Sequence, residues 1–119
     1  MATNKQQFIA RLLPYARRME QQTGIPAAWL LAMAANETGW DAENPVLFGI
    51  KGKSSSGKSG SFGTWEQGAA GPYNTRAEFA TYDDPAEAFA HLTQQSLIKQ
   101  APKTNVQAFA NYLQSKGWA

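Results

Sequence analysis

The stretch of sequence that decides the fold is Pro26-Ala27-Ala28-Trp29-Leu30-Leu31-Ala32-Met33-Ala34-Ala35-Asn36-Glu37, followed directly by Thr38-Gly39-Trp40. Four of its residues recur at i, i+3, i+4 and i+7, the spacing of one helix face: Leu30, Met33, Ala34 and Glu37. We predict an α-helix that ends near Thr38-Gly39, where a glycine can close the last turn. Glu37 would then project from the end of the helix into the space beyond it.

Glu37 is the first candidate for chemistry because it follows an apolar stripe. A carboxylate in such a place is costly to bury as an anion, and desolvation raises its pKa. A glutamate that stays partly protonated near neutral pH can act as a general acid, the group with which glycosidases protonate the leaving oxygen. The alternative is a helix-end glutamate that turns to solvent, and the position alone favours that alternative.

The residues before this stretch predict another helix. Helical spacing relates four of them: Phe8, Leu12, Tyr15 and Met19. Pro14 lacks an N–H and its ring clashes with the preceding turn, so we expect a kinked helix or two short ones. Thr23-Gly24 supplies a stop, and Pro26 stands where a first-turn proline is tolerated.

Residues 41–82 contain no long helical pattern and are rich in glycine. The short apolar pieces Val46–Ile50 and Glu78–Tyr82 could form strands, and Gly52–Gly60 is typical of a flexible polar loop. We therefore predict a small Gly-rich lobe over roughly residues 44–82, with little β-structure, between two helical parts.

Helical signals resume at Asp84, which is followed by a first-turn proline and by a capping-box glutamate, Glu87. The predicted inner face of this helix consists of Phe89, Leu92, Thr93 and Leu97. A last helix would start near Thr104 or Asn105 and stop at Gly117, with four residues inward: Val106, Phe109, Ala110 and Leu113. The fold class is α+β, mostly helical, with a cleft between the helical body and the small lobe.

Composition limits the class of protein and its partners. The 119 residues suit a single domain, 1–119, and their 43% hydrophobic content is that of a globular chain. With no cysteine and the lone His91, read as structural or exposed, we predict no metal and no cofactor. The net charge of +2 is dispersed, which argues against nucleic acid as a partner. No signal peptide or membrane-inserting segment is expected, and the protein is expected to be a monomer.

Several motifs, in order along residues 8–119, resemble glycoside hydrolase family 73, the bacterial endo-β-N-acetylglucosaminidases that include the hydrolase domain of the flagellar rod-cap protein. The matching segments are Ile25-Pro26 through Ala34-Ala35, Glu37-Thr38-Gly39-Trp40, Leu47-Phe48-Gly49-Ile50-Lys51-Gly52, Thr64-Trp65-Glu66, Phe79-Ala80-Thr81-Tyr82-Asp83 and Leu113-Gln114-Ser115-Lys116-Gly117-Trp118-Ala119. The resemblance implies a lysozyme-like helical body with a β-hairpin in the small lobe. It also implies Glu37 as the general acid.

For the second catalytic group the sequence leaves alternatives open. Glu66 matches the glutamate that the family carries on its hairpin, so the resemblance implies an assisting carboxylate there. That group could act as a base on water, or the substrate's own N-acetyl group could be the nucleophile. Asp41 and Glu43 are weaker alternatives.

Sugar rings present apolar faces, so aromatic side chains near the acid are candidates for substrate binding. The candidates are Trp40, Phe48, Trp65, Tyr73, Tyr82 and Trp118. For Phe48 and Tyr82 a core position is favoured. Trp118 stands where the family has a tyrosine, and an indole donates from its N–H but cannot replace a phenol as acceptor or acid.

The function expected from the resemblance is cleavage of the GlcNAc-β-1,4-MurNAc linkage in peptidoglycan glycan strands. One alternative is a muramidase or lytic transglycosylase on the same fold. Another is a non-catalytic wall-binding or assembly module of a phage tail or secretion apparatus. The site of action would be the periplasm or cell wall, reached by a phage, flagellar or other secretion route, or as an excised domain.

Overall fold

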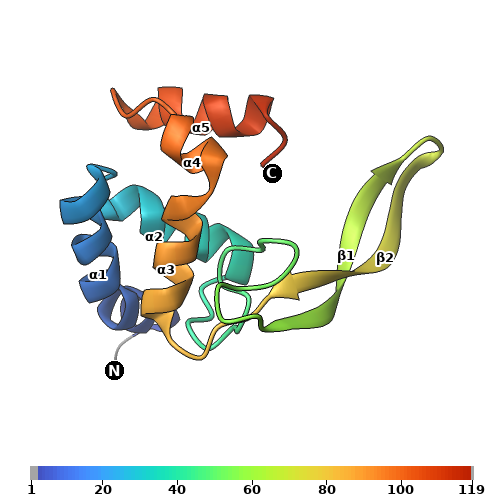
Figure 1. Cartoon of the computed structure of the whole chain (residues 1–119), viewed down its shortest axis with the longest axis horizontal. Helices are drawn as coiled ribbons and strands as arrows, with labels where there is room; N and C mark the ends of the chain where they lie inside the picture. Colours follow the sequence, from blue (N-terminus) through green and yellow to red (C-terminus); the bar gives the residue numbers. More distant parts are fainter. Residues whose placement is uncertain (1–2, 119) are drawn as a thin grey trace.

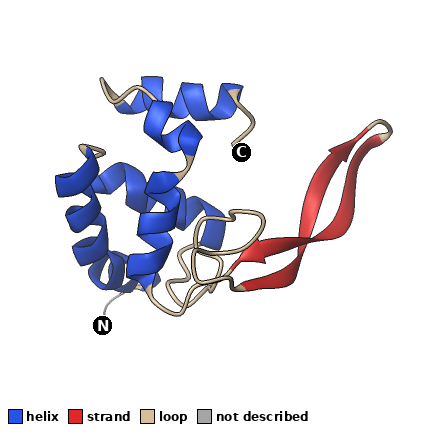
Figure 2. Cartoon of the chain, viewed as in Figure 1, coloured by secondary structure: helices blue, strands red, loops and turns tan. Residues whose placement is uncertain are grey.

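A helical body and a projecting β-hairpin make up the molecule, in a computed structural model that describes residues 3–118 apart from the side chains of Trp65 and Gln67 (Figures 1 and 2). The elements in chain order are α1 (Asn4–Thr23), α2 (Ala27–Thr38), β1 (Ser59–Gly68), β2 (Gly71–Ala80), α3 (Pro85–Gln94), α4 (Ser96–Gln100) and α5 (Val106–Ser115). This is the mostly helical α+β fold that the sequence predicts. None of the described helices is long and apolar enough to cross a membrane.

Helix α1 is continuous through Pro14, so of the two forms we expected, the pair of short helices is wrong. Pro14 and Ala10 both lie on the exposed face, where water can solvate the Ala10 carbonyl that proline leaves without an N–H partner. Thr3 and Gln6 form a capping box at the start of the helix, and Gly24 closes its end with φ 80°.

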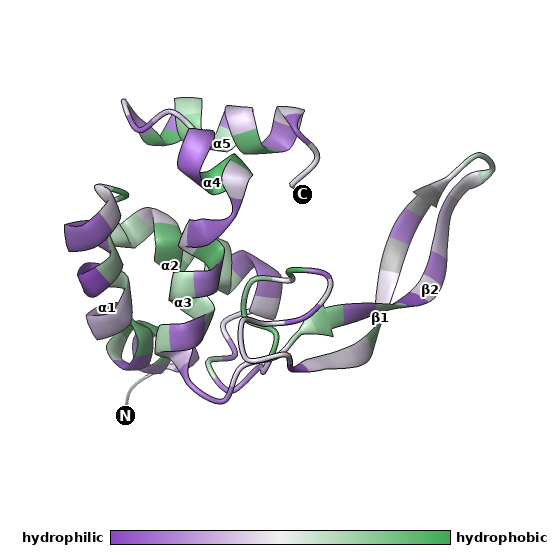
Figure 3. Ribbon diagram, in the orientation of Figure 1, coloured by the Kyte–Doolittle hydropathy of each residue, from purple (hydrophilic) through white to green (hydrophobic). Residues whose placement is uncertain are grey.

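The core lies where α1, α2 and α3 meet, and the segment after α2 completes it. Phe48 is buried there with its ring edge-on to Phe89, at a centroid distance of 5.0 Å. Tyr82 is only 8% exposed, and its hydroxyl lies 2.5 Å from Nδ1 of the half-buried His91. These positions agree with the core placement favoured for Phe48 and Tyr82 and with the structural reading of His91. Figure 3 shows the apolar colouring concentrated on facing helices and at the base of the hairpin.

Val46–Ile50 is not a strand, contrary to prediction. Leu47 has φ 46°, and the N–H groups of Phe48 and Gly49 both bond to the Val46 carbonyl, which makes tight turns. The physical reason is burial. Leu47 and Phe48 are adjacent and both buried, whereas a strand would send them to opposite faces.

The hairpin is longer than the sequence indicated. Strands β1 and β2 pair antiparallel from Ser59 opposite Ala80 to Gly68 opposite Gly71. Of the predicted strand at Glu78–Tyr82, residues 78–80 form the end of β2, and Thr81 and Tyr82 lie beyond it. Residues opposite each other in an antiparallel pair share a face, so one face carries four described residues of β1 that line up in alternation: Gly60, Phe62, Thr64 and Glu66. The opposite strand adds Tyr73, Thr75, Ala77 and Phe79 to the same face.

The C-terminal helices begin where the sequence predicts, but the first of them is divided in two and the last turns a different face to the core. Asp84 caps α3 by accepting from the Ala86 N–H, and Glu87 accepts from the Ser56 hydroxyl. Leu97 belongs to α4, after the break at Gln95. In α5, Phe109 and Leu113 are buried, but Val106 is 54% exposed and Ala110 is also exposed. The inward placement of Val106 and Ala110 is therefore wrong.

Candidate active site

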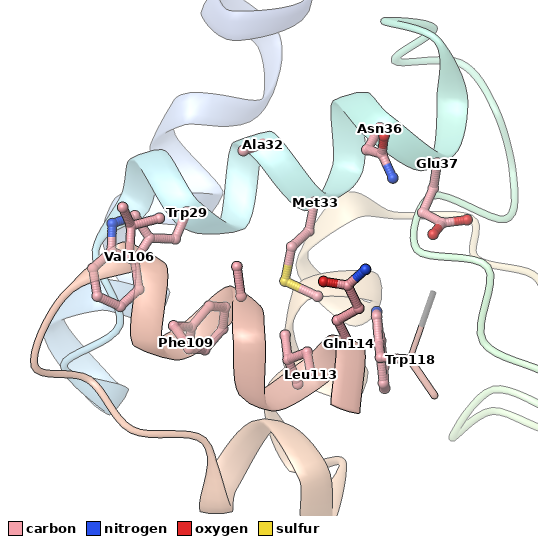
Figure 4. Close-up of a pocket in the computed structure, with 11 residues that line it drawn as sticks. Trp29, Ala32, Met33, Asn36, Glu37, Val106, Phe109, Leu113, Gln114 and Trp118 are labelled. Carbon is pink, nitrogen blue, oxygen red and sulfur yellow. The ribbon is translucent and has the colours of Figure 1, made fainter. Parts of the chain in front are cut away.

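Glu37 lies in the last turn of α2, which ends at Gly39 in the left-handed conformation with φ 63°. The buried face of this helix is formed by Leu30 and Ala34. Met33 and Glu37, four residues apart, lie next to that face and border the open space between α2 and α5 (Figure 4). The predicted stripe therefore divides into a core half and a half that faces a groove.

The Glu37 carboxyl lies against the backbone of Gly49. A Cβ added at Gly49 would be 2.6 Å from Oε2 of Glu37, and Gly49 has φ +64°. Although Glu37 as a whole residue is exposed, the protein around its carboxyl removes part of its hydration. This partial burial raises the pKa of Glu37 above the ordinary 4.5, in the direction that the sequence predicts.

On one side of Glu37 runs an apolar groove of about 230 Å³ between α2 and α5, which we call the α2–α5 groove. Figure 4 shows its two walls, with Met33 and Asn36 above Leu113, Gln114 and Trp118. The full lining is Trp29, Ala32, Met33, Asn36, Glu37, Val106, Phe109, Ala110, Leu113, Gln114 and Trp118. Val106 and Ala110 are exposed because they line this groove.

On the other side of Glu37 lies a more polar depression of about 470 Å³, which we call the hairpin hollow. Its lining is Glu37, Thr38, Asp41, Glu43, Asn44, Pro45, Val46, Leu47, Gly49, Phe62, Gly63, Thr64 and Phe79. Glu37 belongs to the lining of both depressions. The carboxyl with the raised pKa thus stands where a long ligand could pass from one to the other.

Glu66 lies farther out along the hairpin than the residues that line the hollow. It shares a face with Phe62 and Thr64, which do line it, so its side chain belongs to the same side of the hairpin. Its Oε1 accepts from Nζ of Lys51 at 2.5 Å, and its side chain is 29% exposed. Glu37 therefore comes from the body and Glu66 from the hairpin, and the hairpin face that carries Glu66 also carries the residues that line the hollow with Glu37.

The weaker acidic candidates Asp41 and Glu43 both line the hairpin hollow. Glu43 is ion-paired with Arg11 at 3.1 Å, and both side chains are largely exposed. Within residues 3–118, acidic and histidine side chains form no group of three that could hold a metal ion.

The candidate aromatic residues occupy different places. Trp118 lines the α2–α5 groove together with Glu37 (Figure 4). Its backbone N–H donates to the Leu113 carbonyl. Tyr73 is 49% exposed and stands opposite Glu66 on the hairpin. Trp40 lines neither depression that contains Glu37.

Trp40 packs instead edge-on against Phe8, with 5.4 Å between centroids, and the Lys5 ammonium lies 5.3 Å from its ring. Tyr82 is buried, as described above. The side chain of Trp65 lies outside the described residues.

Gly49 and Lys51 belong to one of the motifs of the sequence, but the motif by itself assigns neither residue a role. The structure brings Gly49 to the Glu37 carboxyl and Lys51 to Glu66. The signal that could have identified these two residues is their place in the sequence, because both lie between the predicted acid and the predicted assisting carboxylate. Asn36 and Gln114 were also missed, because their place in the α2–α5 groove depends on how two distant helices pack.

The chain is similar to a family of glycoside hydrolases and to several solved structures of such enzymes. Residues 13–119 match the family model named glucosaminidase and described as mannosyl-glycoprotein endo-β-N-acetylglucosaminidase. No curated protein matches the chain.

Among solved structures, a peptidoglycan hydrolase mutant from Sphingomonas sp. A1 is 30% identical, with a TM-score of 0.79 over 94% of this chain and 82% of that one. The C-terminally truncated glycoside hydrolase domain of FlgJ from Salmonella typhimurium is 28% identical, with a TM-score of 0.62 over 98% of this chain and 87% of that one. The catalytic domain of the autolysin Auto from Listeria monocytogenes shares the fold at 24% identity, with a TM-score of 0.76 over 98% and 76% of the two chains.

Proposed function

We propose, from the fact that this chain belongs to the glucosaminidase family, that it is a peptidoglycan hydrolase in which Glu37 is the general acid. The bond cleaved would be the GlcNAc-β-1,4-MurNAc linkage of the glycan strand. One observation carries the proposal. Glu37 stands at the junction of the α2–α5 groove and the hairpin hollow, and burial against Gly49 raises its pKa.

The chemistry of Glu37 follows from that environment. Breaking a glycosidic bond requires a proton on the leaving oxygen, and an acid is effective when its pKa lies near the working pH. Loss of hydration favours the neutral carboxyl over the anion. The shift in the pKa of Glu37 is therefore in the direction that a general acid requires.

The two depressions provide room for sugar on both sides of the broken bond. The α2–α5 groove is mainly apolar and ends at the Trp118 indole, which suits the flat apolar faces of sugar rings. The amides of Asn36 and Gln114 lie at the same end and can bond to hydroxyl or acetamido groups. The hairpin hollow is more polar and would hold the rings on the other side of Glu37.

Glu66 is proposed as the carboxylate that assists from the opposite side. It belongs to the same hairpin face as Phe62 and Thr64, which line the hollow together with Glu37. It would act as a base on water, or it would support attack by the substrate's own N-acetyl group. Tyr73 lies opposite Glu66 on β2 and is proposed to contact a sugar ring farther along the glycan strand.

The site of action would be the periplasm or cell wall, with delivery by a phage, a flagellar or another secretion route.

The proposal is tested with Glu37→Gln and a matched control, Glu43→Gln, on purified peptidoglycan. Glu43 is an exposed carboxylate in the same hollow, and its Arg11 partner gives it a separate role. We expect Glu37→Gln to lower kcat by about a thousandfold and Glu43→Gln by less than about threefold. Full activity of Glu37→Gln would remove Glu37 from the mechanism. Equal losses in both variants would point to the net charge of the hollow instead.

A further inference from the structure

Lys51 connects the body to the outer part of the hairpin. Its backbone is fixed at the hairpin base, where it forms a bridge with Phe79 and where the neighbouring Gly52 N–H bonds to the Glu78 carbonyl at 3.0 Å. The preceding residue, Ile50, is buried and accepts from the Ala80 N–H at 2.8 Å. Lys51 therefore extends its side chain from a fixed point two residues after Gly49.

The ion pair with Glu66 requires the hairpin to curve. Phe79, the bridge partner of Lys51, pairs on its other side with Gly60. Glu66 lies six residues beyond Gly60, which is about 20 Å along a straight strand and more than a lysine side chain spans. Since Nζ and Oε1 are 2.5 Å apart, the hairpin cannot leave its base as a straight ribbon, and Figure 1 shows it curving and twisting as it projects from the body.

A contact of this kind matters for a two-stranded hairpin. An isolated pair of strands is marginally stable in water, and Gly60, Gly63 and Gly68 weaken β1 further. Exposed ion pairs add little to the stability of a fold. The effect to be expected of this pair is therefore local and concerns the position of Glu66 relative to the hollow.

We propose that Lys51 is a positioning residue, which holds Glu66 and the outer hairpin in place across the hairpin hollow from Glu37. This inference rests on the proposed function, in which Glu66 assists the reaction. Lys51 itself transfers no proton and forms no bond to the substrate in this scheme. Its effect on the reaction passes entirely through Glu66.

A double-mutant cycle tests this dependence. We compare Lys51→Met, Glu66→Gln and the double variant for kcat and KM on soluble, uncross-linked peptidoglycan strands. Lys51→Arg serves as the rescue variant. The matched control is Lys58→Met, because Lys58 is also an exposed lysine paired with a carboxylate, Asp83, and lies at the hairpin base, where its carbonyl accepts from the Thr81 N–H.

We expect Lys51→Met to lower kcat about tenfold or more with KM changed less than about threefold. In the Glu66→Gln background the same substitution should lower kcat by less than about twofold, because the residue it acts through is already disabled. Lys51→Arg should recover most of the loss, and Lys58→Met should behave like the wild type.

Three outcomes would overturn the inference. Normal kcat in Lys51→Met beside an impaired Glu66→Gln would show that Glu66 needs no anchor. Losses that multiply in the double variant would show that Lys51 acts by itself. Normal kcat in Glu66→Gln would remove both the assisting role of Glu66 and the role of Lys51, whereas failure of the proposed function as a whole would appear as activity in Glu37→Gln.

Discussion

Replacing Gly49 by alanine would place a methyl group where the Glu37 carboxyl now lies. The added Cβ would be 2.6 Å from Oε2 and 3.3 Å from Cδ, whereas ordinary contacts begin at 3.4 Å. The carboxyl must therefore retreat by about 0.8 Å, since the Gly49 backbone is held by the turn that begins at Val46. The positive φ adds strain of about 1–2 kcal/mol, which a domain with an ordinary stability of about 5–15 kcal/mol tolerates.

The expected effect is on the reaction and not on the fold. Misplacing a catalytic group by about 1 Å can cost about a hundredfold in rate, so we predict a loss of that size in kcat for Gly49→Ala. A carboxyl that moves away from Gly49 also regains hydration, which lowers its pKa toward 4.5. The alkaline limb of the activity profile should then move to lower pH.

The assay is a pH series of kcat on peptidoglycan, with thermal unfolding measured alongside. Gly57→Ala is the matched control, because Gly57 also has a positive φ, +82°, but a Cβ there meets no atom within 4 Å. We expect this control to lose some stability and to keep its kcat. Normal kcat in Gly49→Ala, or an equal loss in Gly57→Ala, would refute the proposed contact between backbone and acid.

Other predictions follow from the same geometry. Burial raises the pKa of Glu37, so the folded protein binds the Glu37 proton more tightly than the unfolded chain does. The resulting contribution of protonated Glu37 to the stability of the fold is fully present below pH 4.5 and is lost as the pH rises through the pKa of the folded state. Glu37→Gln should therefore melt at a higher temperature than the wild type at pH 7 and at the same temperature near pH 4. A variant that melts lower at pH 7 would contradict this sign. Trp118→Ala should raise KM about five- to tenfold and Trp118→Tyr much less, because stacking on an aromatic ring is retained; equal KM values in steady-state assays would exclude the indole from binding. Trp40→Ala should destabilise the fold by about 2 kcal/mol in denaturant titrations through loss of the Phe8 contact, with kcat nearly unchanged. A large fall in kcat without loss of stability would show instead that Trp40 binds substrate.

The parts of the fold that could be predicted are those with local causes. Helical spacing and the glycine after Thr38 were enough to place the end of α2 and the exit of Glu37, because both are set within a few residues. Asp84 and Asn105 likewise cap α3 and α5 where the sequence suggests.

The predictions fail where the structure depends on contacts between segments that are distant in the sequence. In α5 the sequence marks Val106 and Phe109 alike as apolar, and both border the α2–α5 groove. Val106 is nevertheless 54% exposed, whereas Phe109 is buried and packs against Trp29 of α2, with 5.1 Å between ring centroids. The length of the hairpin could not be predicted, since its glycine-rich strands carry weak propensity and depend on pairing with each other. The contact of Gly49 with Glu37 joins a loop to a helix end and has no periodic signature.

The most direct test of the account is mass spectrometry of the ends released from purified peptidoglycan by the wild type and by Glu37→Gln. The account predicts reducing-end GlcNAc from the wild type and about a thousandfold less from the variant. Reducing-end MurNAc or 1,6-anhydro-MurNAc would contradict the assigned linkage and indicate a muramidase or a lytic transglycosylase. The absence of soluble fragments from folded wild-type protein would contradict catalysis itself and indicate a wall-binding module.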